Sequence, residues 1–343
     1  MNSNDVDVGW LSRRAMLSAG AIAGAAALLA RDPQANAMLQ GAGTVGPGAR
    51  KRALRLAHPT DIHVQPELRA GEGMAACFAH MMALADRPEL IITGGDLPMD
   101  TAATPEARSR IEWDMFNGVL SKNVATGVQV EHTLGNHDMF GRDRAKSGAS
   151  GREPFHGKRW FLDNFGYNTT YRSFDRAGWH FVILDSIYML PGGADYTAKL
   201  DPDQWDWFKA DLAAVPAAMP IVVVSHVPIM SVANFFDKSD LIWANDGPDL
   251  MIENKRMHND CREIDALFQR HRNVKLCLSG HLHLLDHCVY NGVAYICDGA
   301  VSGAKWQGSK RQTAEGYGLI DLYSDGTFEH RYSGYGWVAE RNA

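Results

Sequence analysis

Short clusters of histidine, aspartate and asparagine recur along this sequence at spacings that suit metal ligands. Asp61 and His63 are two residues apart, so on an extended segment both side chains face the same way and can reach one ion. A second pair with this spacing occurs late in the chain, and single residues of the same types lie between the two pairs. The candidate metal ligands are Asp61, His63, Asp96, Asn136, His226, His281 and His283.

Each cluster taken alone has an ordinary structural explanation. Asp-x-His and His-x-His pairs are common at surfaces, Asp96 after two glycines could cap a loop, and His226 could be a hydrogen-bonded core histidine. The run Gly135-Asn136-His137-Asp138 is more specific. The whole set offers four imidazoles, two carboxylates and one amide oxygen without a thiolate. Such a set suits Mn, Fe or Zn rather than Cu(I) or an iron–sulfur cluster.

Five predicted strands lead directly into these clusters. They are short apolar runs at 53–62, 89–93, 128–134, 221–225 and 275–278. Helices are predicted at 72–86, at 201–212 and from Thr104-Pro105-Glu106 onward, with Thr104 as the cap. Hairpins are predicted for 170–174 with 179–185, for 286–290 with 293–297 around Asn291-Gly292, and for 318–323 with 327–332. This alternation predicts an α/β fold whose polar clusters gather at the carboxyl edge of a sheet, where ligands bind in such folds.

Together these motifs resemble the calcineurin-like metallophosphoesterase superfamily. The matching pieces span about residues 53–300 and are Asp61-Ile62-His63, Gly95-Asp96, Gly135-Asn136-His137-Asp138, Ser225-His226 and Gly280-His281-Leu282-His283. The resemblance implies a four-layer α/β sandwich. Two mixed β-sheets would face each other with helices outside, and a dinuclear metal site would lie at the carboxyl ends of the strands.

The resemblance also implies a role for each residue. One divalent ion would be bound by Asp61, His63, Asp96 and His283, and the other by Asp96, Asn136, His226 and His281, with Asp96 as the bridge. A hydroxide shared by two ions about 4 Å apart would attack phosphorus. His137 would protonate the leaving oxygen as general acid, and Asp138 beside it could orient its ring.

One departure from the family pattern narrows the resemblance. Three residues after Asp96, many relatives carry aspartate as a partner of the acid histidine, or tyrosine as a metal ligand in purple acid phosphatases. Here that position is Met99, followed by Asp100, which argues against a purple acid phosphatase. The partner of His137 stays open between Asp138, Asp100 and a backbone carbonyl. The pattern is most similar to the branch that contains class III cyclic-nucleotide phosphodiesterases and related exported phosphoesterases.

The resemblance implies an enzyme that hydrolyses small phosphate esters, with phosphodiesters favoured. One alternative is a phosphomonoesterase that scavenges phosphate. Another is a metal-stabilised binding module that has lost catalysis. Degenerate relatives typically lose ligands or the acid histidine, whereas all of these residues are present here.

Substrate selection is expected to lie in the segments at 139–159, 231–258 and 302–316. These segments are rich in basic or aromatic residues. They could form a rim that attracts phosphate and stacks an aromatic or apolar group, or they could be ordinary solvated loops. The residues concerned are Arg142, Arg144, Lys146, Arg152, Lys158, Arg159, Phe235, Phe236, Trp243, Lys305, Trp306, Lys310 and Arg311.

The first 37 residues have the layout of an export signal. Arg13 and Arg14 precede a weakly hydrophobic run at 15–30, and Ala35-Asn36-Ala37 offers a cleavage site. We therefore predict a twin-arginine signal at 1–37, a linker at 38–52 and a phosphoesterase domain at 53–343. A short N-terminal anchor helix is the alternative. The predicted location is periplasmic or secreted, without a stable membrane anchor after cleavage.

Composition excludes several other classes of protein. The chain has 343 residues, of which 45% are hydrophobic, which excludes a disordered chain and a small disulfide scaffold. A net charge of −6 gives no basic field to hold a nucleic-acid duplex. No apolar run reaches the roughly 18 residues that a membrane helix needs. The five cysteines are predicted to be buried small hydrophobes, with one disulfide after export as the alternative. The sequence does not predict an oligomeric state.

Overall fold

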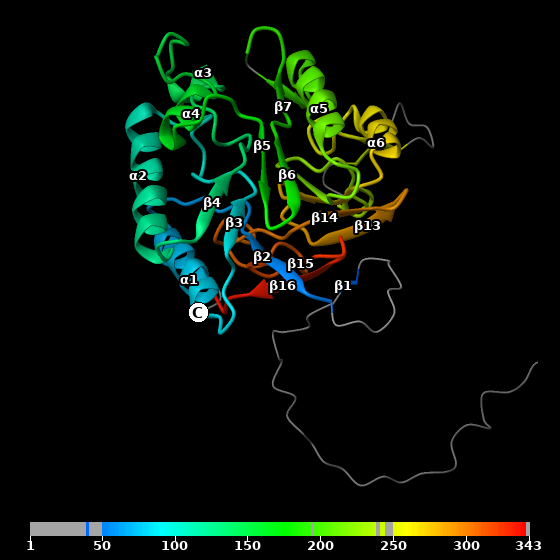
Figure 1. Ribbon diagram of the computed structural model, residues 1–343. Coiled ribbons are helices and arrows are strands. Elements are labelled where there is room, and N and C mark those ends of the chain that lie inside the picture. Colours follow the sequence, from blue (N-terminus) through cyan, green and yellow to red (C-terminus); the bar gives the residue numbers. More distant parts are fainter. Residues whose placement is uncertain (1–38, 41–49, 194, 238–240, 244–249, 341–343) are drawn as a thin grey trace, which may run out of the picture. The chain divides into compact units, whose positions relative to one another are not determined.

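The computed structural model describes residues 39–40, 50–193, 195–237, 241–243 and 250–340 (Figure 1). The predicted signal at 1–37 lies outside the described residues and stays a prediction. Part of the predicted linker is described. Leu39–Gln40 forms strand β1, which pairs with the C-terminal strand β16 (Phe328–Gly334), and strand β2 (Arg52–His58) begins at the last linker residue.

The first six-stranded sheet supplies half of the framework that positions the site. Its strand order is β1-β16-β15-β2-β3-β4. Strands β2, β3 (Leu90–Thr93) and β4 (Gln129–His132) are parallel, and β15 (Gly316–Tyr323) pairs antiparallel with both β2 and β16. The three parallel strands end at the same edge.

The second six-stranded sheet has the order β13-β14-β12-β9-β6-β5. Its four inner strands are parallel and almost wholly buried, as expected for near-continuous apolar runs. Its two edge strands are antiparallel. The strands are β5 (Arg172–Arg176), β6 (Trp179–Leu184), β9 (Ile221–Ser225), β12 (Val274–Ser279), β13 (Asp286–Tyr290) and β14 (Val293–Cys297).

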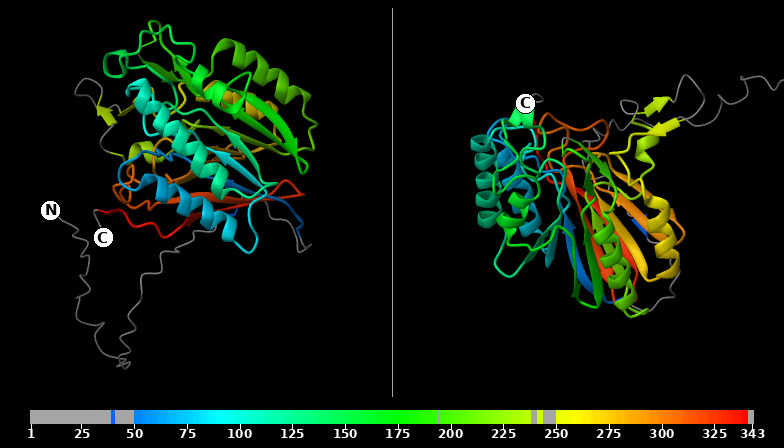
Figure 2. Two further views of the ribbon diagram at one scale, coloured as in Figure 1. Left: turned by 90° about the vertical axis from the view of Figure 1, so that its left-hand side faces the viewer. Right: turned by 90° about the horizontal axis from the view of Figure 1, so that it is seen from above.

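Helices cover the outer face of each sheet, which gives four layers (Figures 1 and 2). Helices α1 (Ala70–Ala83), α2 (Glu106–Asn123) and α4 (Arg159–Phe165) pack on the first sheet. Helices α5 (Pro202–Ala214) and α6 (Cys261–Arg270) pack on the second. Between the sheets lies a core of buried aliphatic and aromatic side chains from both, including Leu56, Ile92, Ile183, Val224 and Leu278. The predicted four-layer α/β sandwich is confirmed.

Most predicted elements are present, with ends that differ by a few residues. Strand β9 and the β13–β14 hairpin have the predicted bounds. The strand predicted at 53–62 ends at His58, because Pro59 has no N–H for the sheet. Thr104 does not cap α2, since its hydroxyl donates to the Asp100 carbonyl. Helices α4 and α6 were not predicted.

The segments between motifs add small elements. The 139–159 segment contains the short helix α3 (Arg144–Ser147), and 231–258 contains the 3-10 helix η1 (Ala233–Phe235) and the pair β10 (Leu241–Trp243) and β11 (Leu250–Ile252). Strands β7 (Ile187–Met189) and β8 (Tyr196–Ala198) form another pair. All five cysteines are free, and three of them are buried. Within the ranges given above, no helix is long and apolar enough to cross a membrane.

Candidate metal centre

The polar clusters predicted from the sequence converge at the carboxyl ends of strands from both sheets. On the first sheet, the segments after β2, β3 and β4 carry four of the residues. On the second sheet, β9 leads directly into a histidine, and β12 leads into the His-x-His pair. The structure brings all seven predicted ligands together: Asp61, His63, Asp96, Asn136, His226, His281 and His283.

One group of donor atoms consists of Asp61, His63 and His283, all of them buried. Nε2 of His283 lies 3.1 Å from Nε2 of His63 and 3.3 Å from Oδ1 of Asp61. Oδ2 of Asp61 accepts hydrogen bonds from the Thr60 hydroxyl and the His281 amide. Oδ1 has no hydrogen-bond partner among the described residues. A buried carboxylate oxygen without a donor is costly, and a bound cation would remove that cost.

The second group consists of Asp96, His226 and His281, with Asn136 beside it. Nε2 of His226 lies 3.3 Å from Oδ2 of Asp96 and 3.2 Å from Nδ1 of His281. The same nitrogen lies 3.2 Å from Oδ1 of Asn136. This group therefore offers two imidazoles, a carboxylate and an amide oxygen to one point.

The Asp96 carboxylate lies between the two groups. Its Oδ1 accepts a hydrogen bond of 2.8 Å from the backbone N–H of His137, which fixes its orientation. Its Oδ2 lies 3.3 Å from Nε2 of His226 in one group and 3.5 Å from Nε2 of His63 in the other. A single oxygen atom within reach of both groups is the arrangement that a ligand bridging two ions requires.

Backbone carbonyls orient three of the four imidazoles. Nδ1 of each donates to a carbonyl oxygen, which turns Nε2 toward the cluster. Histidines that bind metals through Nε2 are held in this way. The pairs are His63 with Met99 at 3.2 Å, His226 with Gly94 at 2.8 Å, and His283 with Gly303 at 2.5 Å.

Five of the seven residues have a left-handed backbone conformation. Their φ angles lie between 48° and 69°, in residues that have a Cβ atom and normally avoid this region. Such strain clusters at functional sites. It also corrects the expected geometry, because each Asp-x-His or His-x-His pair reaches the site from left-handed turns and not from an extended strand. The residues are Asp61, His63, Asp96, His281 and His283.

Burial and neighbouring charges shift the pKa values of these groups, in directions that differ from one residue to the next. Burial, aided by nearby His226, lowers the pKa of His281 to about 3, and burial also lowers the pKa of His63 well below its usual value. Burial would lower the pKa of His226 too, but the Asp96 carboxylate outweighs it and raises that pKa to about 9. The surrounding imidazoles hold the pKa values of Asp61 and Asp96 low despite burial. The carboxylates are therefore ionised, and His63 and His281 are neutral.

His137, the predicted general acid, lies beside the ligands and is partly exposed. Its Nε2 is 4.0 Å from Oδ2 of Asp96, and its Nδ1 is 3.1 Å from Oδ1 of Asp100. Of the three partners that the sequence left open, the structure places Asp100 against the ring.

Asp138, which the sequence suggested as a partner of the His137 ring, binds backbone groups instead. Its carboxylate accepts hydrogen bonds from three backbone N–H groups, those of Gly135 at 2.7 Å, Asp96 at 3.1 Å and Leu97 at 2.7 Å. Burial and the charge of Asp96 raise its pKa to about 7. Asp138 therefore joins the loops that follow β3 and β4 and does not orient His137.

A pocket of about 280 Å³ opens over the ligands. Three cationic side chains line it: Arg256, Lys305 and Lys310. They come from the 231–258 and 302–316 segments. The six basic residues of 139–159 do not line it, and Lys158, for example, pairs with Asp185 at 2.6 Å. The prediction that the 139–159 segment contributes basic residues to the rim is therefore wrong, and the cations at the pocket come from the other two segments.

The aromatic residues expected at the rim also differ from the prediction. Trp306 is buried, and its Nε1 donates to the His63 carbonyl at 2.9 Å, so it supports the site and does not stack substrate. Phe236 is 75% exposed and lines a neighbouring groove with Leu284 and Leu285. Arg311, on the same groove, pairs with Asp237 at 2.5 Å.

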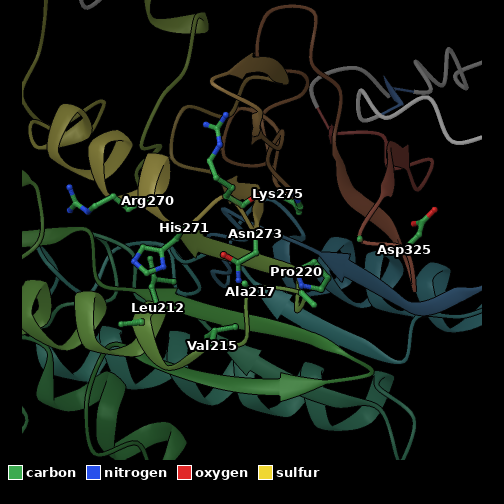
Figure 3. Close-up of a pocket in the computed structure, with 13 residues that line it drawn as sticks. Leu212, Val215, Ala217, Pro220, Arg270, His271, Asn273, Lys275 and Asp325 are labelled. Atoms are coloured by element: carbon green, nitrogen blue, oxygen red, sulfur yellow. Dashed lines mark hydrogen bonds between the residues drawn. The ribbon is translucent and has the colours of Figure 1, made fainter.

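A second cavity, of about 600 Å³, lies at the opposite ends of β9 and β12 (Figure 3). None of the predicted site residues lines it. Two of its polar side chains are bound to the chain itself: Asn273 donates to the Met219 carbonyl, and Lys275 donates to the Arg272 carbonyl. The only cluster of predicted ligands is therefore the one at the carboxyl edges, within the described part of the chain.

The family model for calcineurin-like phosphoesterases matches residues 54–285 of this chain. The chain belongs to the calcineurin-like phosphoesterase family. This assignment confirms the superfamily suggested by the motifs. The donor groups fit the two divalent cations that such a fold implies, since Oδ1 of Asp61 has no donor and Oδ2 of Asp96 faces both groups.

Several named proteins are similar in sequence to this chain. A 3′,5′-cyclic-nucleotide phosphodiesterase of Nostoc sp. is 23% identical over 81% of this chain and 91% of its own length. A probable cyclic nucleotide phosphodiesterase of Synechococcus sp. is 25% identical over 67% of this chain and 73% of its own. A purple acid phosphatase of Arabidopsis thaliana is 26% identical over 70% of this chain but only 48% of its own.

The fold is also found in a solved structure. A dimetal phosphatase from Danio rerio aligns with a TM-score of 0.56 over 82% of this chain and 97% of that chain, at 13% identity. At this identity the likeness concerns the fold, and it agrees with the two facing sheets described above.

Proposed function

We propose that this chain is a dinuclear-metal phosphodiesterase. The observation that carries the proposal is the position of the Asp96 carboxylate, whose Oδ2 lies 3.3 Å from Nε2 of His226 and 3.5 Å from Nε2 of His63. A site for one ion would not need a carboxylate oxygen shared between two groups of imidazoles. The family assignment supports hydrolysis of a phosphate ester.

In this proposal the chain holds two divalent ions, Mn, Fe or Zn. When bound, two such ions supply Lewis-acid charge and an activated water for an in-line displacement at phosphorus. The ligands of the first would be Asp61, His63, Asp96 and His283, and those of the second Asp96, Asn136, His226 and His281.

His137 would act as the general acid that protonates the leaving oxygen. Its Nε2 faces the pocket beside the ligands, while Oδ1 of Asp100 lies 3.1 Å from Nδ1 on the other side of the ring. A carboxylate at Nδ1 fixes the orientation of the ring and stabilises the imidazolium form that donates the proton.

Two of the similar proteins are named as cyclic-nucleotide phosphodiesterases, which favours a phosphodiester substrate for this chain. A phosphomonoesterase is the second candidate, and one feature of the pocket favours it. Lys305 and Lys310 both line the pocket, and two ammonium groups suit the dianionic phosphate of a monoester. A metal-stabilised binding module would hold the ions without turnover.

One set of assays separates these candidates. The full chain is reconstituted with Mn²⁺, its metal content is measured, and turnover of bis-p-nitrophenyl phosphate is compared with that of p-nitrophenyl phosphate. We expect close to two ions per chain and a larger kcat/KM for the diester. A larger kcat/KM for the monoester would replace the phosphodiesterase by a phosphatase. Two bound ions without turnover of either ester would support the binding module.

We further propose that the protein is exported to the periplasm or secreted by the twin-arginine route. The support is the Arg13-Arg14 pair ahead of a weakly hydrophobic run and the Ala35-Asn36-Ala37 cleavage site. Replacing both arginines by lysine should retain the protein in the cytosol, because the route depends on the arginine pair. Cleavage and export of the double variant would contradict this proposal.

A further inference from the structure

A half-buried lysine lies beside the proposed acid in the pocket above the ligands. Nζ of Lys305 is 3.5 Å from Nε2 of His137. No ion pair between Lys305 and a carboxylate occurs among the described residues, although the neighbouring cation Arg256 pairs with Asp237 at 2.9 Å. An ammonium group that lines a pocket next to a reactive histidine, without its own carboxylate, is available to an anionic ligand.

The loop that carries this lysine, residues 302–308, is bound to the backbone and side chains of the ligand residues. The Ser302 hydroxyl donates to the Asp61 carbonyl at 2.7 Å, and the Gly303 carbonyl accepts from Nδ1 of His283 at 2.5 Å. The Trp306 indole donates to the His63 carbonyl at 2.9 Å. The position of Lys305 is therefore tied to the same residues that form the first ligand group.

Packing and backbone conformation also fix the loop that carries Lys305. Trp306 is buried against helix α1 at Gly73, where any side-chain carbon would collide with the indole ring. Lys305 and Trp306 have φ angles of 54° and 68°, so two consecutive residues with a Cβ atom are held in the left-handed region. This conformation is costly for a lysine in a solvated loop, and it turns a long cationic side chain toward His137.

We infer that Lys305 is a catalytic residue that binds a non-bridging oxygen of the phosphoryl group while His137 protonates the leaving oxygen. The inference rests on the proposed function. In the hydrolysis, a bond forms between a water oxygen and phosphorus. The bond between phosphorus and the alcohol oxygen breaks, and that oxygen takes its proton from His137. The proton that the attacking water loses passes to solvent, from which His137 is protonated again. Charge on the non-bridging oxygens is stabilised by positioned donors.

The distance between Lys305 and His137 allows one to bind a non-bridging oxygen while the other protonates the leaving oxygen. The two donors are 3.5 Å apart, so two oxygens of one tetrahedral phosphoryl group can contact both at the same time. Lysine presents a compact charge to phosphate, and a charge-assisted hydrogen bond is stronger than a neutral one. The alternative role is purely structural, in which the ammonium group only supports the imidazole ring.

Three variants of the Mn²⁺-loaded full chain test the inference. Lys305→Met removes the charge at similar length, and Lys305→Arg keeps it. Lys275→Met is the matched control, because Lys275 lies on β12 at the end remote from the site (Figure 3). The measurements are kcat/KM for bis-p-nitrophenyl phosphate, affinity for inorganic phosphate by calorimetry, metal content and Tm.

For Lys305→Met we expect kcat/KM to fall by about 10²-fold and phosphate affinity by about tenfold, with metal content and Tm unchanged. Lys305→Arg should retain activity within about tenfold of the wild type, and Lys275→Met should match the wild type. A loss below about threefold in both quantities for Lys305→Met would overturn the inference, as would loss of metal in that variant. If the wild type turns over no ester, the proposed function fails. In that case the phosphate affinities still decide whether Lys305 binds the anion.

Discussion

The imidazole of His137 lies against the carboxylate of Asp100, with Nδ1 3.1 Å from Oδ1. In the family pattern an aspartate partner is expected at position 99, which here is Met99. The Met99 carbonyl instead accepts from Nδ1 of His63 at 3.2 Å. The short segment after β3 thus supplies the shared carboxylate of Asp96, a carbonyl that orients one ligand and a carboxylate beside the ring of the proposed acid.

Asp100→Asn tests that orientation, because it keeps the shape of the side chain and removes its charge. We expect kcat for an alkyl phosphodiester to fall by about 10- to 100-fold, since the neutral amide supports the imidazolium form poorly. Steady-state kinetics with metal analysis is the measurement. Unchanged kcat, or a loss of bound metal, would show that Asp100 does not act through His137.

Removing the shared carboxylate charge should affect both ions. In Asp96→Asn we expect less than one metal ion per chain after Mn²⁺ reconstitution, and activity reduced by at least about 10²-fold, because a ligand of both groups is weakened. His281→Ala removes a ligand of one group only, so it should retain about one ion. Elemental analysis of both variants checks this, and wild-type metal content below one ion per chain would contradict the dinuclear site.

A glycine close to the ligands offers a test through packing alone. A methyl group on Gly280 would overlap the Thr60 hydroxyl and the Asp61 carboxylate. Gly280→Ala should therefore displace Asp61, weaken metal binding and lower the free energy of unfolding by about 1–3 kcal/mol. Gly118→Ala, in α2 with open space around it, is the matched control and should be neutral or stabilising by up to about 1 kcal/mol. Equal effects of the two changes in denaturant unfolding would refute the overlap.

The seven candidate ligands could be predicted from the sequence because each follows an apolar strand closely, and parallel strands end at one edge. The turns after those strands could not be predicted. Asp138 is next to His137 in the chain, whereas Asp100 belongs to the segment after the preceding strand. Only the fold shows that three backbone N–H groups occupy the Asp138 carboxylate, while Asp100 lies beside the ring. In the sequence, Lys305 is only one of several basic residues in the loops, and nothing in the spacing distinguishes it. Its position depends on Trp306 packing against Gly73, a contact between distant segments that spacing does not reveal.

Away from the site, the environment of His180 should make part of the free energy of unfolding depend on pH. Burial lowers its pKa, but hydrogen bonds to Asp211 at 3.0 Å and Asp175 at 2.6 Å outweigh burial and raise it above 6.5. A raised pKa in the folded state stabilises the protein fully below about pH 6.5, and this contribution is lost as the pH rises through the folded-state pKa. His180→Gln should therefore cost about 1–2 kcal/mol at pH 6 and less at pH 9 in urea unfolding. A difference that grows with pH would contradict this sign.

If His137 is the general acid, the loss of kcat on its removal should depend on the leaving group of the substrate. His137 follows the predicted ligand Asn136, but its ring points into the pocket and its Nδ1 side is held by Asp100, so His137→Ala should keep both metal ions. General acid catalysis contributes about 10²–10⁴-fold. An alkoxide leaving group needs the proton, whereas p-nitrophenolate, with a far lower pKa, needs it much less. The loss of kcat should therefore be large for alkyl or sugar-linked diesters and small for bis-p-nitrophenyl phosphate. Equal loss on both classes, with metal intact, would assign His137 to substrate positioning. Loss of metal would make it a structural support, and either result would remove the proton donor from the mechanism.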